Sequence, residues 1–377
     1  MPHTLLNSST EYTPADDASK AMGEIFKLPA EPKTELGRYR ILSPSAAIRV
    51  SPLCLGAMSL GNQWTGVMGA GPDFEESCKL LDTFYEAGGN FIDTANNYQD
   101  EQSEMIVGEW MEKRQIRDEI VLATKYSTYA LDRKEGKFQG IAANYVGNHK
   151  KNLILTVDSS LKKLRTNYID LLYVHWWDYS TSIPELMQSL NDVVKSGKVL
   201  YLGISDTPAW IVSQANEYAR QHGLSQFVVY QGLWNVSVRD LERDVIPMCR
   251  ANGMGLAPWG ALGRGKFKSP EELQKQSTWR GGSPPSERDL KVSKTLQEVA
   301  EEVGGGVRAA NVAMAWVRQA LKIHLTQDQI DKLSKASEFD LGFPMNYFGT
   351  DAHYLPEGKP NTFVLNAAAH LKFTSFP

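Results

Sequence analysis

YIDLLYVHWWDYSTSIPELMQSLNDVVKSGKVLYLGISD, residues 168–206, decides the fold class. Two apolar, β-branched runs, 169–174 and 199–205, enclose a stretch in which apolar side chains recur every three or four residues. Gly197 is well placed to end that helix. A strand, a helix and a second strand in this order are typical of a βαβ unit, which sets the two strands parallel in one sheet.

The same alternation continues along the chain. Five further strands are predicted, which makes seven in all: 52–57, 91–93, 120–125, 227–231 and 253–259. Each repeat takes roughly 30 residues, the length of a βαβ unit. No GxGxxG follows the first strand, so an α/β fold of the (β/α)8 barrel type is favoured over a doubly wound sheet. In such a barrel the chemistry lies at the C-terminal ends of the strands.

Composition excludes several other classes of function. The 377 residues are 42% hydrophobic and 22% charged, as in ordinary globular proteins. The net charge of −4, with no basic run, argues against a nucleic-acid partner, and the three scattered cysteines predict neither disulfides nor a metal site. No apolar stretch approaches the ~18 residues of a membrane span, and no signal peptide is visible. A soluble cytoplasmic protein without a membrane partner is expected.

Domain limits are predicted from composition. Residues 1–36 are polar and acidic without a sustained period, which indicates a disordered leader. The barrel is expected over 37–348, and 349–377 is expected to be an irregular C-terminal tail.

Polar side chains follow several of the predicted strands. Asp93, Lys125 and His175 each stand at a strand end, and Tyr98 follows Asp93 closely enough to fold back over the same rim. Taken singly, such an Asp or Lys is more often a cap or a surface charge, and such a His is as often a satisfied core residue. Together on one rim they predict a catalytic group.

One reaction suits these four residues. A tyrosine hydroxyl with a pKa of ~10 is a poor acid at neutral pH, but the Lys125 ammonium would favour the phenolate and lower that pKa. Asp93 would hold Lys125, and His175 would hydrogen-bond a carbonyl oxygen and orient it toward Tyr98. This arrangement protonates a polarised carbonyl and still needs a hydride.

A nicotinamide would supply the hydride. Ser205, Asp206 and Gln231 are predicted to bond its carboxamide, with Asp93 also in the cofactor-binding set, and Trp234 is predicted to stack on the ring. A glycine-rich loop with two cations is predicted to meet the pyrophosphate. Its residues are Gly260, Ala261, Leu262, Gly263, Arg264, Gly265 and Lys266. Such loops are common, so the loop taken alone is more often a plain surface loop.

These motifs resemble those of the aldo-keto reductases, and more closely the fungal aryl-alcohol dehydrogenases and norsolorinic acid reductase-like enzymes. The resemblance runs from about Gly37 to about Phe348. It rests on GGNFIDTANNYQDEQSEMIVGEWM, LATKY, YIDLLYVHWWD, GKVLYLGISDTPAW, VVYQGLWN, RDLERDVIPMCR and GLAPWGALGRGKF. It implies a TIM barrel, NADPH across the C-terminal rim, and Asp93, Tyr98, Lys125 and His175 as the catalytic tetrad. An aromatic or polyketide-type aldehyde or ketone of fungal secondary metabolism is the implied substrate.

The chain departs from the family pattern in three places. Asp206 stands where the family usually has Asn, and Trp234 where it usually has Tyr. After the predicted helix 308–321 the family has an eighth strand and a helix that grip the 2′-phosphate of the cofactor, but here the segment 321–336, LKIHLTQDQIDKLSKA, follows at once. We see no strand in 41–50 or in the tail in the right place to fill the gap. The sequence therefore predicts a barrel that lacks its eighth strand and a weakened NADPH grip.

Two other functions remain open from the sequence. A cofactor-binding or inactive reductase-like protein would follow from the incomplete cofactor site. A barrel glycoside hydrolase would need two carboxylates beside a sugar site, for which Asp93 and Asp178 are the candidates. Lys125 beside Asp93 suits hydride-transfer chemistry better.

Overall fold

The computed structural model describes residues 26–27, 29–129, 140–274, 284–317, 324–342 and 345–348. It divides into one compact unit of residues 32–339 and another of 1–31 with 340–377. In the second unit α13 spans Met345–Phe348. Most of the predicted leader and all of the tail 349–377 lie outside the described residues, so those domain limits stay predictions.

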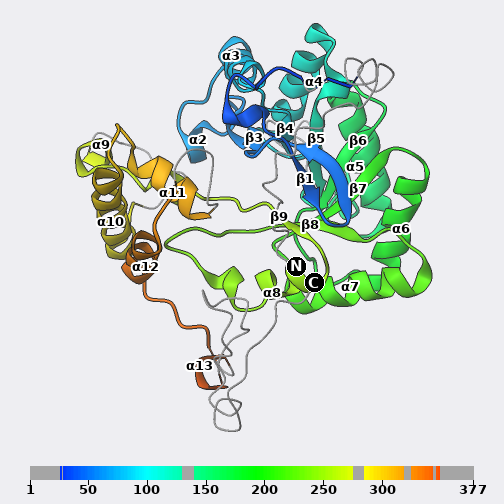
Figure 1. Cartoon of the computed structure of the whole chain (residues 1–377). Coiled ribbons are helices and arrows are strands. Elements are labelled where there is room, and N and C mark those ends of the chain that lie inside the picture. Colours follow the sequence, from blue (N-terminus) through cyan, green and yellow to red (C-terminus); the bar gives the residue numbers. More distant parts are fainter. Residues whose placement is uncertain are drawn as a thin grey trace, which may run out of the picture. The chain divides into compact units, whose positions relative to one another are not determined.

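The larger unit contains seven parallel strands, β3 to β9, in the order of the sequence (Figure 1). Their bounds are β3 Leu55–Gly56, β4 Phe91–Asp93, β5 Val121–Tyr126, β6 Ile169–Val174, β7 Val199–Ser205, β8 Phe227–Gln231 and β9 Gly255–Leu256. All seven predicted strands are confirmed. The end strands β3 and β9 are shorter than the predicted 52–57 and 253–259, because among the described residues each of them has a hydrogen-bonded neighbour on one side only.

The sheet is curled into a half-barrel. Gln231 at the end of β8 donates from Nε2 to Asp93 Oδ1 at 3.3 Å, although three strands separate β8 from β4. A flat sheet with strands ~4.8 Å apart could not bring these side chains together. Among the described residues no strand joins β3 to β9, as the absence of an eighth strand predicts.

A two-stranded antiparallel hairpin, β1 Arg40–Ser43 and β2 Ala46–Val50, lies outside this sheet. Its Ala46 and Val50 pack in one apolar cluster with Phe91 and Val121, the first residues of two neighbouring strands. The hairpin therefore closes the N-terminal end of the half-barrel. This hairpin was not predicted from the sequence, and it does not fill the gap between β3 and β9.

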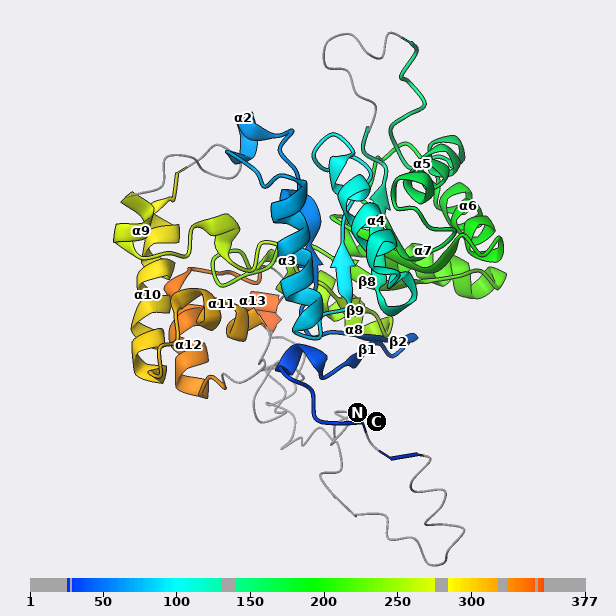
Figure 2. The ribbon, with the colours of Figure 1, turned by 90° about the horizontal axis from the view of Figure 1, so that it is seen from above.

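Helices cover the outer face of the sheet, with α3 to α7 side by side around it (Figures 1 and 2). Their bounds are α2 Thr65–Met68, α3 Phe74–Glu86, α4 Gln102–Arg114, α5 Lys150–Lys163, α6 Ile183–Lys195, α7 Ala209–His222, α8 Val245–Ala251 and α9 Pro270–Gln274, and short 3-10 turns are η1 Glu35–Gly37, η2 Ala57–Ser59, η3 Arg117–Glu119, η5 Asp240–Glu242 and η6 Gly263–Gly265. Ser182 caps α6, whose Leu186 and Leu190 are buried, and Gly197 follows its end at φ 76°, as predicted. No described helix is long and apolar enough to cross a membrane.

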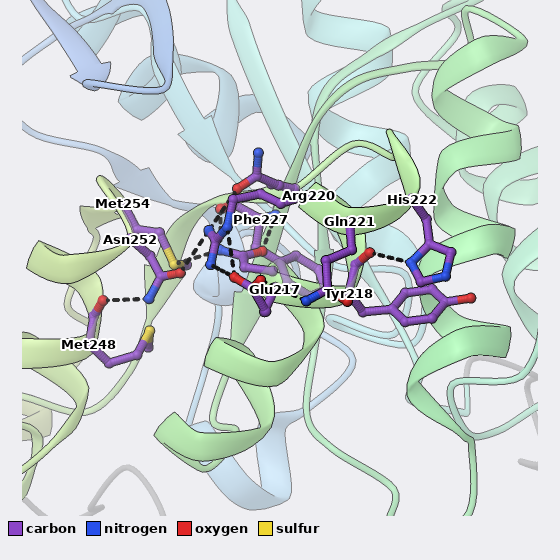
Figure 3. Close-up of polar contacts among 11 residues, drawn as sticks. Glu217, Tyr218, Arg220, Gln221, His222, Phe227, Met248, Asn252 and Met254 are labelled. Atoms are coloured by element: carbon purple, nitrogen blue, oxygen red, sulfur yellow. Dashed lines mark hydrogen bonds and ion pairs between the residues drawn. The ribbon is translucent and has the colours of Figure 1, made fainter.

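Side chains at the end of α7 hold neighbouring elements in place (Figure 3). Arg220 donates to Glu217 on its own helix at 2.7 Å and to Asn252, just after α8, at 3.2 Å. Asn216 is fully buried and forms two hydrogen bonds with the backbone of Phe227, the first residue of β8. The side chain thereby satisfies the backbone N–H and C=O of the residue at which the strand begins.

Three helices, α10 Glu287–Val303, α11 Ala309–Val317 and α12 Gln327–Ala336, form a separate group with an apolar core of their own. Val236 and Phe267, from the segments after β8 and β9, join that core. The predicted helix 308–321 is confirmed as α11, although residues 318–323 lie outside the described part of the chain.

Candidate active site

Lys125, near the end of β5, carries a charge in a fully buried position. Its Nζ donates to Asp93 Oδ2 at 2.6 Å and to the Thr94 carbonyl at 2.8 Å. Burial works to lower the pKa of Lys125, but the Asp93 carboxylate and Tyr98 outweigh it and raise the pKa above its ordinary value. The side chain is therefore an ammonium at neutral pH.

Tyr98 follows β4 and lies against this ammonium. Lys125 Nζ is 4.9 Å from the centroid of the Tyr98 ring and hydrogen-bonds the tyrosine hydroxyl. The His175 ring, at the end of β6, meets the Tyr98 ring nearly edge-on at 5.8 Å between centroids. The structure thus brings together all four residues that the sequence singled out for catalysis.

The loop that carries Tyr98 has an unusual backbone. Gln99, Asp100 and Glu101 have φ of 52°, 50° and 76°, a left-handed conformation that residues other than glycine rarely adopt. Buried Gln99 holds the loop, since its side chain accepts from the Trp64 amide at 2.8 Å and donates to the Met58 carbonyl at 3.0 Å. Nothing in the sequence signalled this conformation.

His175 is held through its backbone and its ring. Its amide donates to the Tyr126 carbonyl at 3.2 Å, and its Nδ1 lies 3.1 Å from the Thr128 hydroxyl. Burial and the Lys125 charge lower the pKa of His175 from 6.5 to about 3. The imidazole is therefore neutral at physiological pH, and it can donate through one nitrogen only.

Asn148 is a residue of the site that sequence reasoning missed. It is fully buried, and its side chain donates to Ser127 Oγ at 2.8 Å and to the Trp176 carbonyl at 3.0 Å. Its Oδ1 also accepts from the Asp178 amide at 2.9 Å. Asn148 thereby ties the end of β5 to the segment after β6. A single Asn in a long loop gives no sequence signal of this kind.

The residues predicted to bond a carboxamide share one rim. Ser205 and Gln231 are register partners at the ends of β7 and β8, and the Asp206 amide donates to the Gln231 carbonyl at 3.1 Å. Asp206 has φ of 40°, and its Oδ1 accepts from the Trp259 indole at 3.2 Å. Gln231 also bonds Asp93, so the predicted cofactor residues adjoin the catalytic ones.

The predicted pyrophosphate loop is only partly available for a ligand. Lys266 Nζ pairs with Asp289 on α10 at 3.2 Å, which neutralises one of the two cations. Arg264 lies over the Trp259 ring at 5.0 Å. Gly260 and Gly263 have positive φ, and an added Cβ would lie 2.6 Å from the Leu233 side chain at the first and 2.7 Å from Phe267 at the second. Ala261, Leu262 and Gly265 complete the loop.

Trp234 lies beside α11 instead of standing free. Its ring is 5.3 Å from the Trp316 ring at a tilt of 50°, and its indole donates to Glu242 at 2.9 Å. The stacking role that the sequence suggested for it stays a prediction.

Asp178, the second carboxylate of the glycoside hydrolase alternative, is already engaged. It accepts from the amides of Asn148, Ser180 and Thr181 and from the Thr181 hydroxyl, at 2.7 to 2.9 Å. Although burial works to raise its pKa, these hydrogen bonds lower the pKa to about 2. A carboxyl group held in this form is a poor general acid, so the geometry gives this alternative no support.

The chain is similar in sequence to a known enzyme family and to several of its members. Residues 52–337 match the model of the Aldo/keto reductase family. Norsolorinic acid reductase A of Aspergillus parasiticus is 49% identical over 340 residues, which covers 84% of this chain and 85% of the relative. An aryl-alcohol dehydrogenase of Pestalotiopsis microspora is 47% identical over 376 residues, 93% of this chain and 94% of the relative.

The aryl-alcohol dehydrogenase (NADP+) of Phanerodontia chrysosporium is 45% identical over 357 residues, 86% of this chain and 92% of the relative. In each case the alignment is longer than the number of residues of this chain that it includes, so it contains gaps on the side of this chain. The relatives therefore carry residues that have no counterpart here.

Proposed function

The chain belongs to the aldo/keto reductase family, and we propose that it reduces an aromatic or polyketide-type aldehyde or ketone to the alcohol with NADPH, or catalyses the reverse oxidation. The names of the relatives support the substrate class and the cofactor. The observation that carries the proposal is the buried Lys125–Asp93 ion pair beside Tyr98, with a neutral His175 against the same ring. We place the activity in the cytoplasm, as the sequence predicts.

The residues at the rim fit a nicotinamide dinucleotide in their chemistry. Ser205 and Gln231 offer a hydroxyl and an amide, and Asp206 offers an acceptor that an amide N–H can reach. Arg264 supplies a cation in a loop of positive-φ residues, a backbone type that suits phosphate oxygens. These residues would hold the carboxamide and the pyrophosphate, and a reduced nicotinamide, when bound, supplies a hydride to the carbonyl carbon.

The residues of this chain provide the other half of the reduction. His175 would donate a hydrogen bond to the carbonyl oxygen and orient it toward Tyr98. Tyr98 would then donate its hydroxyl proton to that oxygen, and the adjacent Lys125 ammonium stabilises the phenolate that remains. Asp93 keeps Lys125 in place and balances its charge.

Two measurements test the proposal. Titration of the full chain with NADPH, and separately with NADH, should quench tryptophan fluorescence with saturation. Tyr98→Phe should then lower kcat on an aromatic aldehyde by about 100-fold or more, the usual share of a general acid, with the Kd for NADPH unchanged. Tyr168→Phe, which loses a hydroxyl bonded to exposed Asp118, is the matched control and should keep full turnover. A Tyr98→Phe protein as active as this control would remove Tyr98 from the mechanism.

A second candidate function is a reductase-like protein that binds cofactor weakly and turns over little or no substrate. The pairing of Lys266 with Asp289 favours it, because that lysine can grip a phosphate only after the ion pair breaks. The open side of the half-barrel favours it as well, since the described residues contain no eighth strand to hold the 2′-phosphate. Binding of NADPH no tighter than NADH, without turnover on aromatic aldehydes and ketones, would favour this candidate.

A further inference from the structure

Thr128, two residues beyond β5, lies between two side chains from the end of β6. The Trp176 indole donates from Nε1 to Thr128 Oγ1 at 2.9 Å, and the same hydroxyl lies 3.1 Å from His175 Nδ1. An indole N–H can only donate. The Thr128 oxygen is therefore the acceptor in the first of these hydrogen bonds.

The first hydrogen bond favours one direction for the second. A threonine hydroxyl has one hydrogen, and among the described contacts of Thr128 Oγ1 the partner left for it is His175 Nδ1. If the hydroxyl donates to Nδ1, that nitrogen carries a lone pair, and a neutral imidazole then carries its proton on Nε2. The low pKa of His175 keeps the ring neutral, so the assignment holds over the physiological range.

The backbone around Thr128 is fixed independently of this hydroxyl. Its carbonyl accepts from Asn96 Nδ2 at 2.8 Å, and Asn96 is itself buried next to the Tyr98 loop. The His175 amide lies 3.3 Å from Ser127 Oγ, the side chain of the residue before Thr128. Both partners of the Thr128–His175 hydrogen bond are therefore held at their backbones.

We propose that Thr128, oriented by Trp176, is a positioning residue that fixes His175 as the Nε2–H tautomer. That tautomer leaves Nε2–H as the donor toward a carbonyl oxygen, whereas the opposite one would aim a lone pair at it. The inference deepens the proposed function and rests on it for its catalytic meaning. The tautomer itself is measurable without turnover, so failure of the two proposals can be told apart.

The first test reads the tautomer directly. The full chain, labelled with 15N in its histidine rings, is studied by long-range 1H–15N correlation NMR at pH 7, with His175→Gln to assign the signals. Wild type and Thr128→Ser should show Nδ1 unprotonated and Nε2 protonated. Thr128→Val, which keeps the shape and loses the hydroxyl, should shift His175 toward a mixture or toward Nδ1–H. A protonated Nδ1 in wild type, or an unchanged pattern in Thr128→Val, would overturn the proposal.

The second test reads the consequence in kinetics. Thr128→Val should lower kcat/KM on an aromatic aldehyde by about tenfold, the loss of one typical hydrogen bond, with the Kd for NADPH unchanged. Thr128→Ser keeps the hydroxyl and should have the wild-type rate. If Thr128 only filled space, the smaller serine would not be expected to preserve the rate better than valine. Thr83→Val, which removes an exposed hydroxyl on α3, is the control and should change neither quantity. A Thr128→Val protein with wild-type kcat/KM contradicts the positioning role.

A further variant covers the case in which Thr128→Val fails to fold. Trp176→Phe removes the indole donor and frees the Thr128 hydroxyl to rotate. The Nε2–H fraction of His175 should fall in this variant, by less than in Thr128→Val. An unchanged fraction shows that Trp176 does not orient the hydroxyl and overturns that part of the proposal.

Discussion

At the scale of single residues, the charge of one buried lysine influences the protonation of its neighbours in the site. The Lys125 ammonium is stable in a fully buried position because the Asp93 carboxylate lies 2.6 Å away. This carboxylate helps to raise the pKa of Lys125. The same charge helps to keep His175 uncharged. A charged lysine and a neutral histidine therefore occupy the site together at neutral pH. A neutral histidine can orient a carbonyl without competing with Tyr98 as the acid.

His175 also predicts how stability depends on pH. Its pKa is lowered from 6.5 to about 3, so between these values the unfolded chain binds a proton at this side chain and the folded chain does not. Stability must therefore fall as pH falls through this window, by up to about 1.4 kcal/mol per pH unit. Between pH 7 and pH 5, wild type should lose about 1–2 kcal/mol more free energy of unfolding than His175→Gln in urea denaturation.

The control for this prediction is His222→Gln, which removes an exposed histidine at the end of α7. It should lose as much stability as wild type over the same pH range. If His175→Gln behaves like this control, then His175 is not kept neutral by its surroundings.

At the scale of elements, the β/α rhythm could be predicted and the details of the loops could not. The strands were readable because parallel strands covered by helices are continuous apolar runs. The β1–β2 hairpin was missed, since its burial pattern is set by the strand ends that it covers. The left-handed run of Gln99, Asp100 and Glu101 and the tie made by Asn148 depend on partners far along the chain. The conformational propensity of a short stretch of sequence does not depend on such distant partners, so it cannot predict them.

Lys163, the last residue of α5, holds the start of α4 and the Tyr98 loop. Its Nζ lies 2.8 Å from both Glu101 Oε1 and Glu104 Oε2, and Glu104 is fully buried. Replacing Lys163 by Met leaves a buried carboxylate without its cation. We expect the free energy of unfolding to fall by about 3–5 kcal/mol in urea denaturation. We also expect kcat to fall, because the strained loop loses its hold on Glu101.

Two further variants interpret that result. Lys198→Met breaks the half-exposed pair with Asp158 and should cost no more than about 1 kcal/mol. Glu104→Gln combined with Lys163→Met should recover part of the loss, since no buried charge is then left unpaired. Equal stability of Lys163→Met and Lys198→Met would show that the buried pair is unimportant.

At Gly108, α4 approaches the backbone at the end of α5 closely. A Cβ at this position would meet the Lys163 carbonyl and would lie 2.6 Å from Leu164 Cα, both of them backbone atoms that cannot swing away. Gly108→Ala should therefore destabilise the fold by about 1–3 kcal/mol, although alanine is the better helix former by about 1 kcal/mol. Thermal unfolding would measure this against Gly66→Ala in α2, where a Cβ has open space. A stabilised Gly108→Ala would contradict the close approach.

At the scale of the whole unit of residues 32–339, the open side falls nearer to the cofactor residues than to the proton donor. Asp93, Lys125 and His175 come from the ends of β4, β5 and β6, which all have neighbours on both sides. The predicted cofactor loop follows β9, an end strand. With no eighth strand in the described part of the chain, cofactor binding should therefore be weakened more than the proton chemistry.

The half-barrel makes a testable prediction for amide hydrogen exchange. Each amide of a strand with two neighbours donates to one of them, whereas alternate amides of an end strand point away from the sheet and have no ladder partner, and an end strand opens by breaking one ladder. Exchange measured by mass spectrometry at pH 7 should therefore be slowest in peptides that contain β5, β6 and β7 and faster in those that contain β3 or β9. In a closed barrel no such gradient would run from the centre to the two ends. If β3 and β9 exchange as slowly as β6, then a segment outside the described residues pairs with them and closes the barrel.

Saturating NADPH should slow exchange around β8 and β9 if the cofactor binds at this rim, and it should leave the N-terminal hairpin β1–β2 unchanged.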